Sequence, residues 1–135
     1  MSLDRLYLSR NEHTFWGTAI MEKFLLIIRE DLKRLRRHTK KEQLSELLDM
    51  QEWTDWIIAS GNYIDSNPLK SSGRYITKDT ILSDGPFIEA KEGVSGYYLI
   101  HASSMEDAIE ITQRCPLLKR GLAVVEVRPV DAKPR

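Results

Sequence analysis

Residues 24–28, Phe-Leu-Leu-Ile-Ile, are continuously apolar and are followed at once by Arg29, Glu30 and Asp31. A short apolar run that ends abruptly at charges is typical of a strand covered on both of its faces. Such a strand needs a neighbour along each edge and packed side chains above and below it. The run therefore predicts a sheet whose first strand, starting near Ile20, lies at the centre.

A long helix is expected after this strand. Thr39 and Glu42 have the spacing of a capping box, in which the hydroxyl and the carboxylate each accept a hydrogen bond from a free amide. Gly61-Asn62 is a typical helix end, so the helix should run from about residue 40 to residue 60. Its apolar residues recur at helical spacing, which predicts that they face the sheet, with the tryptophans as core anchors: Leu44, Leu47, Leu48, Trp53, Trp56 and Ile57.

Residues 31–41 form a basic run that contains Lys33, Arg34, Arg36 and Arg37, but no aromatic residue on which a base could stack. Charge runs of this kind are usually solvated, so we expect a solvated loop or the segment that leads into a helix rather than a surface that binds nucleic acid. Over the whole chain, 20 basic and 20 acidic residues cancel. Direct binding to nucleic acid is therefore not expected.

The second half of the chain alternates strand-like and helical segments. Ser103 and Glu106 repeat the capping-box spacing, and the helix that follows should end at Pro116. The further strands are expected over residues 62–69, 73–77 (which Ile81-Leu82 could extend), 96–102 and 122–130. The order strand, helix, strands, helix, strand predicts an α+β fold, a ferredoxin-like sandwich with both helices on one face of an antiparallel sheet.

Composition narrows the class of protein. The 135 residues suit one domain, expected over residues 20–131 with an extension at 1–19 and a tail at 132–135. No apolar run is long enough for a membrane span, and the start of the chain lacks an apolar signal core, so we expect a cytoplasmic protein that does not bind membranes. The single cysteine and three scattered histidines show no ligand spacing, which predicts no metal site and no cofactor.

The open face of the predicted sheet needs a partner. In the last strand, Ala123, Val125 and Val127 suit the side under the helices, whereas Val124, Glu126 and Arg128 point the other way, together with Leu122 and Val130. A monomer would expose this mixed apolar and charged surface to water. We therefore expect a homodimer whose sheets face each other and leave polar cavities between them.

A turn and a charge cluster occupy residues 83–92. Asp84-Gly85-Pro86 has the composition of a tight turn. Lys91 could bind a carboxylate or a phosphate, and Glu89 could act as a base if it is partly desolvated. The alternative, given equal weight, is an ordinary rigid turn with solvated charges.

Other chemistry-bearing residues have a functional and a structural interpretation. His101 and Tyr97 share a strand face, and His101 could titrate near neutral pH, although a lone histidine is more often structural. Glu126 and Arg128 could hold a ligand or form an interface ion pair. Arg74 could bind an anionic ligand, and Cys115 is expected to be buried and inert.

Several ordered blocks carry a family resemblance: residues 83–92, 96–100 and 125–130, together with Ala108 and Arg114-Cys115-Pro116. With these blocks the chain resembles the DGPF branch of the YCII-related family over about residues 21–131. The resemblance implies a ferredoxin-like fold that dimerises into an α+β barrel, with a pocket near Asp84 and Phe87. It also implies an association with extracytoplasmic-function sigma factors.

The chain departs from the family pattern at two positions. Many members carry a histidine near the start of the first helix and an aspartate just before the proline that follows the second. Here residues 42–56 contain no histidine, His38 lies early, and Cys115 stands where the aspartate is expected. The acid/base pair of the family is therefore not expected in this chain.

Three functions fit these observations. The first is a dimeric small-molecule-binding or regulatory module, and the second is a metal-free enzyme acting on a small cyclic or carbonyl substrate. The third is an accessory partner of an extracytoplasmic-function sigma factor. The candidate pocket residues are Arg74, Asp84, Phe87, Glu89, Lys91, Tyr97 and Arg128, and the candidate catalytic residues are Glu89, His101 and Glu126.

Overall fold

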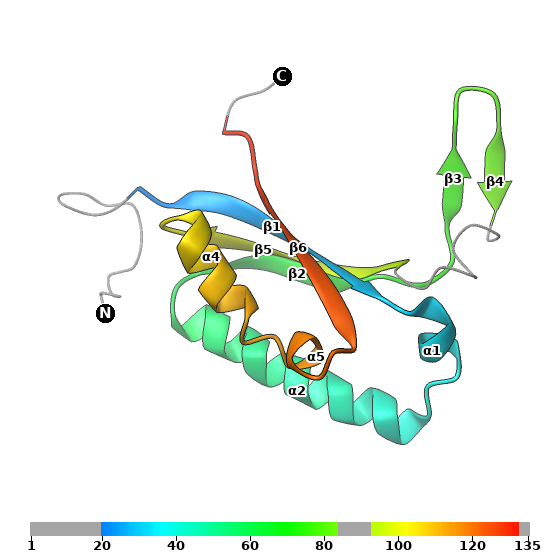
Figure 1. The fold of residues 1–135 in the computed structure, drawn as a ribbon, viewed down its shortest axis with the longest axis horizontal. Coiled ribbons are helices and arrows are strands. Elements are labelled where there is room, and N and C mark those ends of the chain that lie inside the picture. Colours follow the sequence, from blue (N-terminus) through cyan, green and yellow to red (C-terminus); the bar gives the residue numbers. More distant parts are fainter. Residues whose placement is uncertain (1–19, 84–92, 133–135) are drawn as a thin grey trace.

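The computed structural model describes residues 20–83 and 93–132, and its centre is an antiparallel sheet in the order β2-β5-β1-β6 (Figure 1). The helices α2, α4 and α5 lie on one side of this sheet (Figure 1). This arrangement confirms the ferredoxin-like α+β fold. The strands of the sheet are β1 (Glu22–Glu30), β2 (Tyr63–Pro68), β5 (Gly93–Ala102) and β6 (Ala123–Pro129), and the helices are α1 (Leu32–Arg36), α2 (Lys40–Ala59), α4 (Met105–Thr112) and α5 (Pro116–Lys119).

Strand β1 is central, as its apolar run predicts. It pairs antiparallel with β5 along one edge and with β6 along the other. Phe24, Leu26 and Ile28 are buried beneath the helices, while Leu25 and Ile27 point to the open face and are half-buried there. Because both faces of the strand contact apolar neighbours, its sequence shows no polar alternation.

The capping box at the start of α2 is present. The Glu42 amide donates to Thr39 Oγ1 at 3.1 Å, and the Thr39 amide donates to Glu42 Oε1 at 2.9 Å. The helix ends at Ala59 with Ser60 as its C-cap, and Gly61 follows with a φ of 82°, a left-handed conformation that glycine adopts without strain.

The prediction of which α2 side chains are buried is only partly confirmed. Trp53 and Ile57 are buried, and the Trp53 indole donates to the Ile111 carbonyl at 3.2 Å. Leu44, Leu47 and Leu48 are instead 56%, 61% and 60% exposed, and Trp56 is 37% exposed with Arg114 stacked on its ring. Apolar side chains cover more of the helix circumference than one buried stripe can use, so helical spacing alone does not identify the buried ones.

The cap of α4 lies one residue later than predicted. Ser104, not Ser103, is the capping residue, and its hydroxyl accepts a hydrogen bond from the Asp107 amide at 3.1 Å. The Asp107 carboxylate in turn accepts one from the Ser103 amide at 2.9 Å. Two overlapping cap patterns compete in this sequence. In the observed register α4 buries Ala108, Ile111 and Thr112.

Residues 73–83 do not join the main sheet. They form a separate hairpin of β3 (Arg74–Ile76) and β4 (Ile81–Ser83), which projects from the body of the fold (Figure 1). The expectation that Ile81-Leu82 extends the strand at 73–77 is therefore wrong, because the chain reverses between Thr77 and Thr80. The Thr77 amide donates to the Thr80 carbonyl at 2.8 Å and closes this turn.

Candidate functional site

A cavity of about 560 Å³ lies between α2 and the part of the sheet formed by β2 and β5. Its volume is in the range of pockets that hold small molecules. Apolar walls come from residues such as Leu47, Met50 and Ile58. Polar groups gather at two places along it, a charged cluster beside β1 and a row of hydroxyls beside β2.

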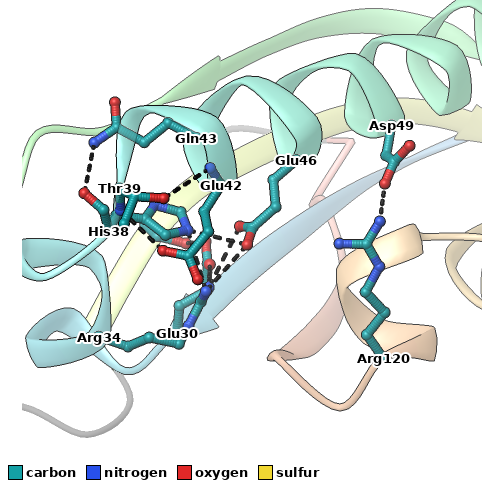
Figure 2. Close-up of polar contacts among 10 residues, drawn as sticks. Glu30, Arg34, His38, Thr39, Glu42, Gln43, Glu46, Asp49 and Arg120 are labelled. Atoms are coloured by element: carbon teal, nitrogen blue, oxygen red, sulfur yellow. Dashed lines mark hydrogen bonds and ion pairs between the residues drawn. The ribbon is translucent and has the colours of Figure 1, made fainter.

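The charged cluster, defined here as Glu30, Arg34, His38 and Glu46, joins three elements (Figure 2). Arg34 of α1 donates from Nη2 to Glu30 Oε1 of β1 at 2.9 Å and from Nη1 to Glu46 Oε2 of α2 at 3.1 Å. His38 Nε2 lies 3.0 Å from the same Glu46 oxygen and 3.2 Å from Arg34 Nη1. The side chains of Glu30, His38 and Glu46 are 8%, 7% and 12% exposed, so the cluster is largely shielded from solvent.

Local structure brings these four residues together. Asp31 accepts hydrogen bonds from the Lys33 and Arg34 amides and starts α1 directly after β1, which places Arg34 back over Glu30. The cap at Thr39 then fixes His38 immediately before α2, and Glu46 follows two turns along that helix. Two short connections therefore bring these four ionisable side chains together beside one end of the cavity.

A β-bulge in β5 adds Ser95 to this end of the cavity. The pairing of β1 with β5 shifts after Ile28, so that Ser95 has no partner residue on β1. Its hydroxyl donates to Glu30 Oε2 at 2.5 Å, and both groups are buried. Both oxygens of Glu30 are therefore hydrogen-bonded, one to Ser95 and one to Arg34.

The glycines around this bulge allow close packing. A Cβ on Gly93 would lie 2.3 Å from Leu32 Cδ1, so glycine lets α1 pack against β5. A Cβ on Gly96 would lie 3.1 Å from the Asn67 carbonyl of β2. Gly96 thus forms part of the cavity wall, and Gly93 allows Leu32 to pack closely against β5.

The electrostatics of the cluster favour the charged forms of Glu46 and Arg34. Burial alone would raise the pKa of Glu46, but hydrogen bonds and charges from Arg34 and His38 outweigh it and lower that pKa. Burial alone would lower the pKa of Arg34, but Glu46 and Glu30 outweigh it and raise that pKa. Glu46 is therefore ionised at neutral pH.

The row of hydroxyls consists of Thr54, Tyr98, Tyr63 and Ser66. Thr54 Oγ1 donates its single hydrogen to the Met50 carbonyl at 2.8 Å, so the Tyr98 hydroxyl must donate to Thr54, at 2.6 Å. Tyr63 and Ser66 hydroxyls lie 2.8 Å apart. Burial raises the pKa of Tyr98, an effect that the hydrogen bond with Thr54 partly offsets. The row supplies neutral hydrogen-bonding groups to the wall of the cavity.

Cys115 lies behind the cavity and is fully buried. Its Sγ is 3.9 Å from the sulfur of Met50, a residue of the cavity wall. Burial raises the pKa of the Cys115 thiol, which keeps it protonated at neutral pH. The prediction of a buried, unreactive cysteine agrees with this environment.

The predicted residues of β5 and β6 lie on the open face of the sheet, opposite the charged cluster. Tyr97 donates to Asp65 at 3.0 Å and also borders the cavity at the edge of β2, and His101 pairs across the sheet with Lys23. Glu126 forms ion pairs within the chain, with Arg29 at 2.6 Å and with Arg128 at 3.1 Å. The hydrogen bonds from Arg29 and then Arg128 lower the pKa of Glu126.

The remaining predicted residues are not brought to the cluster. Arg74 lies at the base of the hairpin, beside a separate hollow of about 340 Å³ that Leu32, Val94 and residues 69–73 also line. Asp84, Phe87, Glu89 and Lys91 lie outside the described residues. In the described ranges, no group of His, Cys, Asp and Glu side chains could hold a metal ion, and no helix is long and apolar enough to cross a membrane.

The charged cluster was not predicted from the sequence. His38 and Arg34 belong to the basic run that suggested solvated charges, and Glu30 looked like the end of a strand. One signal was present, because Glu30, Arg34 and His38 are spaced four residues apart. The position of His38 just before the capped helix also places it near the start of the first long helix.

Comparison with known proteins gives the family. Residues 24–131 match the model of the YCII-related domain. The chain is also 35% identical over 57 residues to an uncharacterised protein of Rhizobium meliloti, a match that spans 42% of this chain and 46% of that protein. The likeness to this relative thus covers less than half of either chain. The match to the domain covers most of the present sequence, and the chain belongs to the YCII-related domain family.

Proposed function

We propose that this chain binds a small molecule in the cavity between α2 and the β2 and β5 strands, as a binding or regulatory module. The observation that carries the proposal is His38, whose side chain is 7% exposed, lies 3.0 Å from Glu46 and borders a cavity of about 560 Å³. A shielded ionisable pair beside a cavity with apolar walls is typical of ligand sites.

A thermal-shift screen with a broad set of metabolites tests this proposal. A ligand present at about 100 times its Kd stabilises the folded state by about 2.7 kcal/mol, which raises the melting temperature measurably. We expect Glu46→Ala, which removes the shielded carboxylate that His38 faces, to abolish the shift, and Lys41→Ala, an exposed control in the same helix α2, to retain it. The absence of any stabilising compound, or equal stabilisation of Glu46→Ala, would contradict the proposal.

A second candidate function is metal-free acid/base catalysis on a small cyclic or carbonyl substrate. In the tautomer in which His38 Nε2–H donates to Glu46 Oε2, 3.0 Å away, Nδ1 carries the lone pair, and no described residue forms a hydrogen bond with it. A carboxylate that holds one imidazole nitrogen orients the ring and leaves the other nitrogen for proton transfer. His38 would then be the base and Glu46 its positioning residue, in place of Glu89, His101 or Glu126.

The catalytic candidate is distinguished from simple binding by turnover. Once a stabilising compound is found, its conversion is followed by NMR with wild type, His38→Gln and His101→Gln. Loss of conversion in His38→Gln alone, with binding retained, supports catalysis. Binding without conversion in the wild type leaves the regulatory module as the function, and loss in His101→Gln alone would move catalysis to the open face.

The expected homodimer is the third element of the proposal. Val124 is 49% exposed on the open face, where half-buried Leu25 and Ile27 lie beside charged Arg29 and Glu126. Burial of this face against a second copy would remove apolar surface from water and form the expected barrel with its inter-sheet pocket. Size-exclusion chromatography with light scattering should give twice the chain mass for the wild type and the single mass for Val124→Glu. A monomeric wild type at micromolar concentration would rule out this dimer.

Association with an extracytoplasmic-function sigma factor stays a prediction from the family resemblance. Co-purification of such a factor with the tagged chain is the measurement that supports this association. Its absence from repeated pull-downs would count against it.

A further inference from the structure

The charged cluster lacks one positive charge. Glu30 and Glu46 contribute two carboxylates, and Arg34 contributes one guanidinium that both carboxylates share. With a neutral His38 the cluster therefore carries a net charge of minus one in a largely shielded place. An uncompensated charge away from water is unfavourable, so the cluster should attract one more cation.

The carboxylates, not the guanidinium, are on the cavity side. Glu30, His38 and Glu46 line the cavity, whereas Arg34 does not, and its Nη1 and Nη2 are already bound to the two glutamates. Among the described residues that line the cavity there is no lysine or arginine. A ligand carboxylate would thus approach two carboxylates, whereas an ammonium group would be attracted to them.

From this arrangement we infer that the cavity selects a singly charged cationic ligand, a small amine with an apolar body, and discriminates against anions. This inference rests on the proposed small-molecule binding in the cavity. The ammonium group would lie beside Glu46 and Glu30, and the apolar body would contact Leu47, Met50 and Ile58. A hydroxyl or carbonyl at the far end would meet the row of hydroxyls.

The ligand and a proton on His38 compete for the same negative charge. The charged groups that face His38 are Glu30 from β1, Arg34 from α1, and Glu46 and the more distant Glu42 from α2. A protonated His38 already neutralises the cluster, so an ammonium must displace that proton to gain the same attraction. Lower pH favours the protonated form of His38, so amine affinity should rise with pH, by at most about tenfold per pH unit for one displaced proton.

A matched set of probes tests the inference on the full chain. Cyclohexylmethylamine, cyclohexylmethanol and cyclohexanecarboxylate share one ring and differ in charge. Their binding is measured by isothermal titration calorimetry at pH 6 and pH 8, in two buffers of different ionisation enthalpy. We expect the amine to bind at least about tenfold more tightly than the carboxylate at pH 8. We also expect the affinity gap between the amine and the carboxylate to be smaller at pH 6 than at pH 8, with one proton released wherever the amine displaces it from His38.

Variants separate this inference from the proposal on which it rests. Glu46→Gln should reduce the preference for the amine, while Glu52→Gln, an exposed control on the same helix, should retain it. If Glu46→Gln does not fold, the pH dependence of the wild type decides. Binding of the alcohol and the carboxylate with rejection of the amine would overturn the inference and leave the binding proposal standing. Binding of none of the three would overturn the inference, and the metabolite screen would then decide the binding proposal.

Discussion

The two faces of the same sheet use similar charged residues in different surroundings. On the helix-covered face, Arg34 joins Glu30 and Glu46 in a shielded cluster beside a cavity. On the open face, Arg29 and Arg128 join Glu126, whose side chain is 37% exposed. Solvent screens the second group and only weakly screens the first. An ion pair beside a sheet therefore indicates a candidate binding site only when its side chains are shielded from solvent.

Removal of Arg34 should have the largest effect, because it leaves two shielded carboxylates without a cation. We expect Arg34→Ala to lower the free energy of unfolding by about 3 kcal/mol at pH 7, measured by urea denaturation. A loss near zero would show that the cluster is solvated and would remove the difference between the two faces.

Gly93→Ala should also destabilise the helix-covered face, because the added Cβ would lie 2.3 Å from Leu32 Cδ1. We expect a loss of about 1–3 kcal/mol, since the buried Leu32 side chain must leave its present position to admit the added Cβ. The double variant with Leu32→Ala removes the clash and should lose less than the sum of the two single variants. Strict additivity would show that α1 does not pack on this glycine.

The pH dependence of stability should differ between Glu46→Gln and the wild type. The pKa of Glu46 is lowered in the folded state, so its contribution is complete above the unfolded value near 4.5 and is lost as pH falls through the folded value. We expect Glu46→Gln to be less stable by about 1.5–3 kcal/mol at pH 7, and the difference to shrink below pH 4.5. A difference that stays constant down to pH 3 would contradict an ionised, paired Glu46.

Arg128→Ala on the open face should have the smallest effect. Its side chain is 64% exposed, and Glu126 keeps Arg29 as a partner. We expect no measurable change in the unfolding of the monomeric Val124→Glu background. A loss as large as that of Arg34→Ala would show that both faces hold equally strong ion pairs.

Local patterns predicted the fold better than the site. The apolar run of β1 and the capping box of α2 depend on neighbours in sequence, and both occur as expected. The exposed Leu44 and Leu48 on α2 show that the spacing of apolar residues does not reveal how much of a helix its neighbours cover.

The site depends on how the chain returns over itself. In the sequence, Glu30 resembles the end of a strand, and Arg34 and His38 resemble part of a solvated basic run. In the structure, the turn at Asp31 and the cap at Thr39 bring the three side chains into contact. Ser95 contacts Glu30 because of a β-bulge in β5, and the amino-acid composition of this segment does not predict that bulge. His101 and Glu126 were correctly placed on a sheet face, but the shielded charges lie on the opposite one.

The central claim is that the helix-covered face, and not the open face of this chain, binds the small molecule. Protein NMR with cyclohexylmethylamine at pH 8 tests it directly, with Val124→Glu used to keep the open face uncovered. The account predicts chemical-shift changes at His38, Ser95 and Tyr98, and none at Leu25, Leu99 or His101. Changes confined to Leu25, Leu99 and His101 would contradict it.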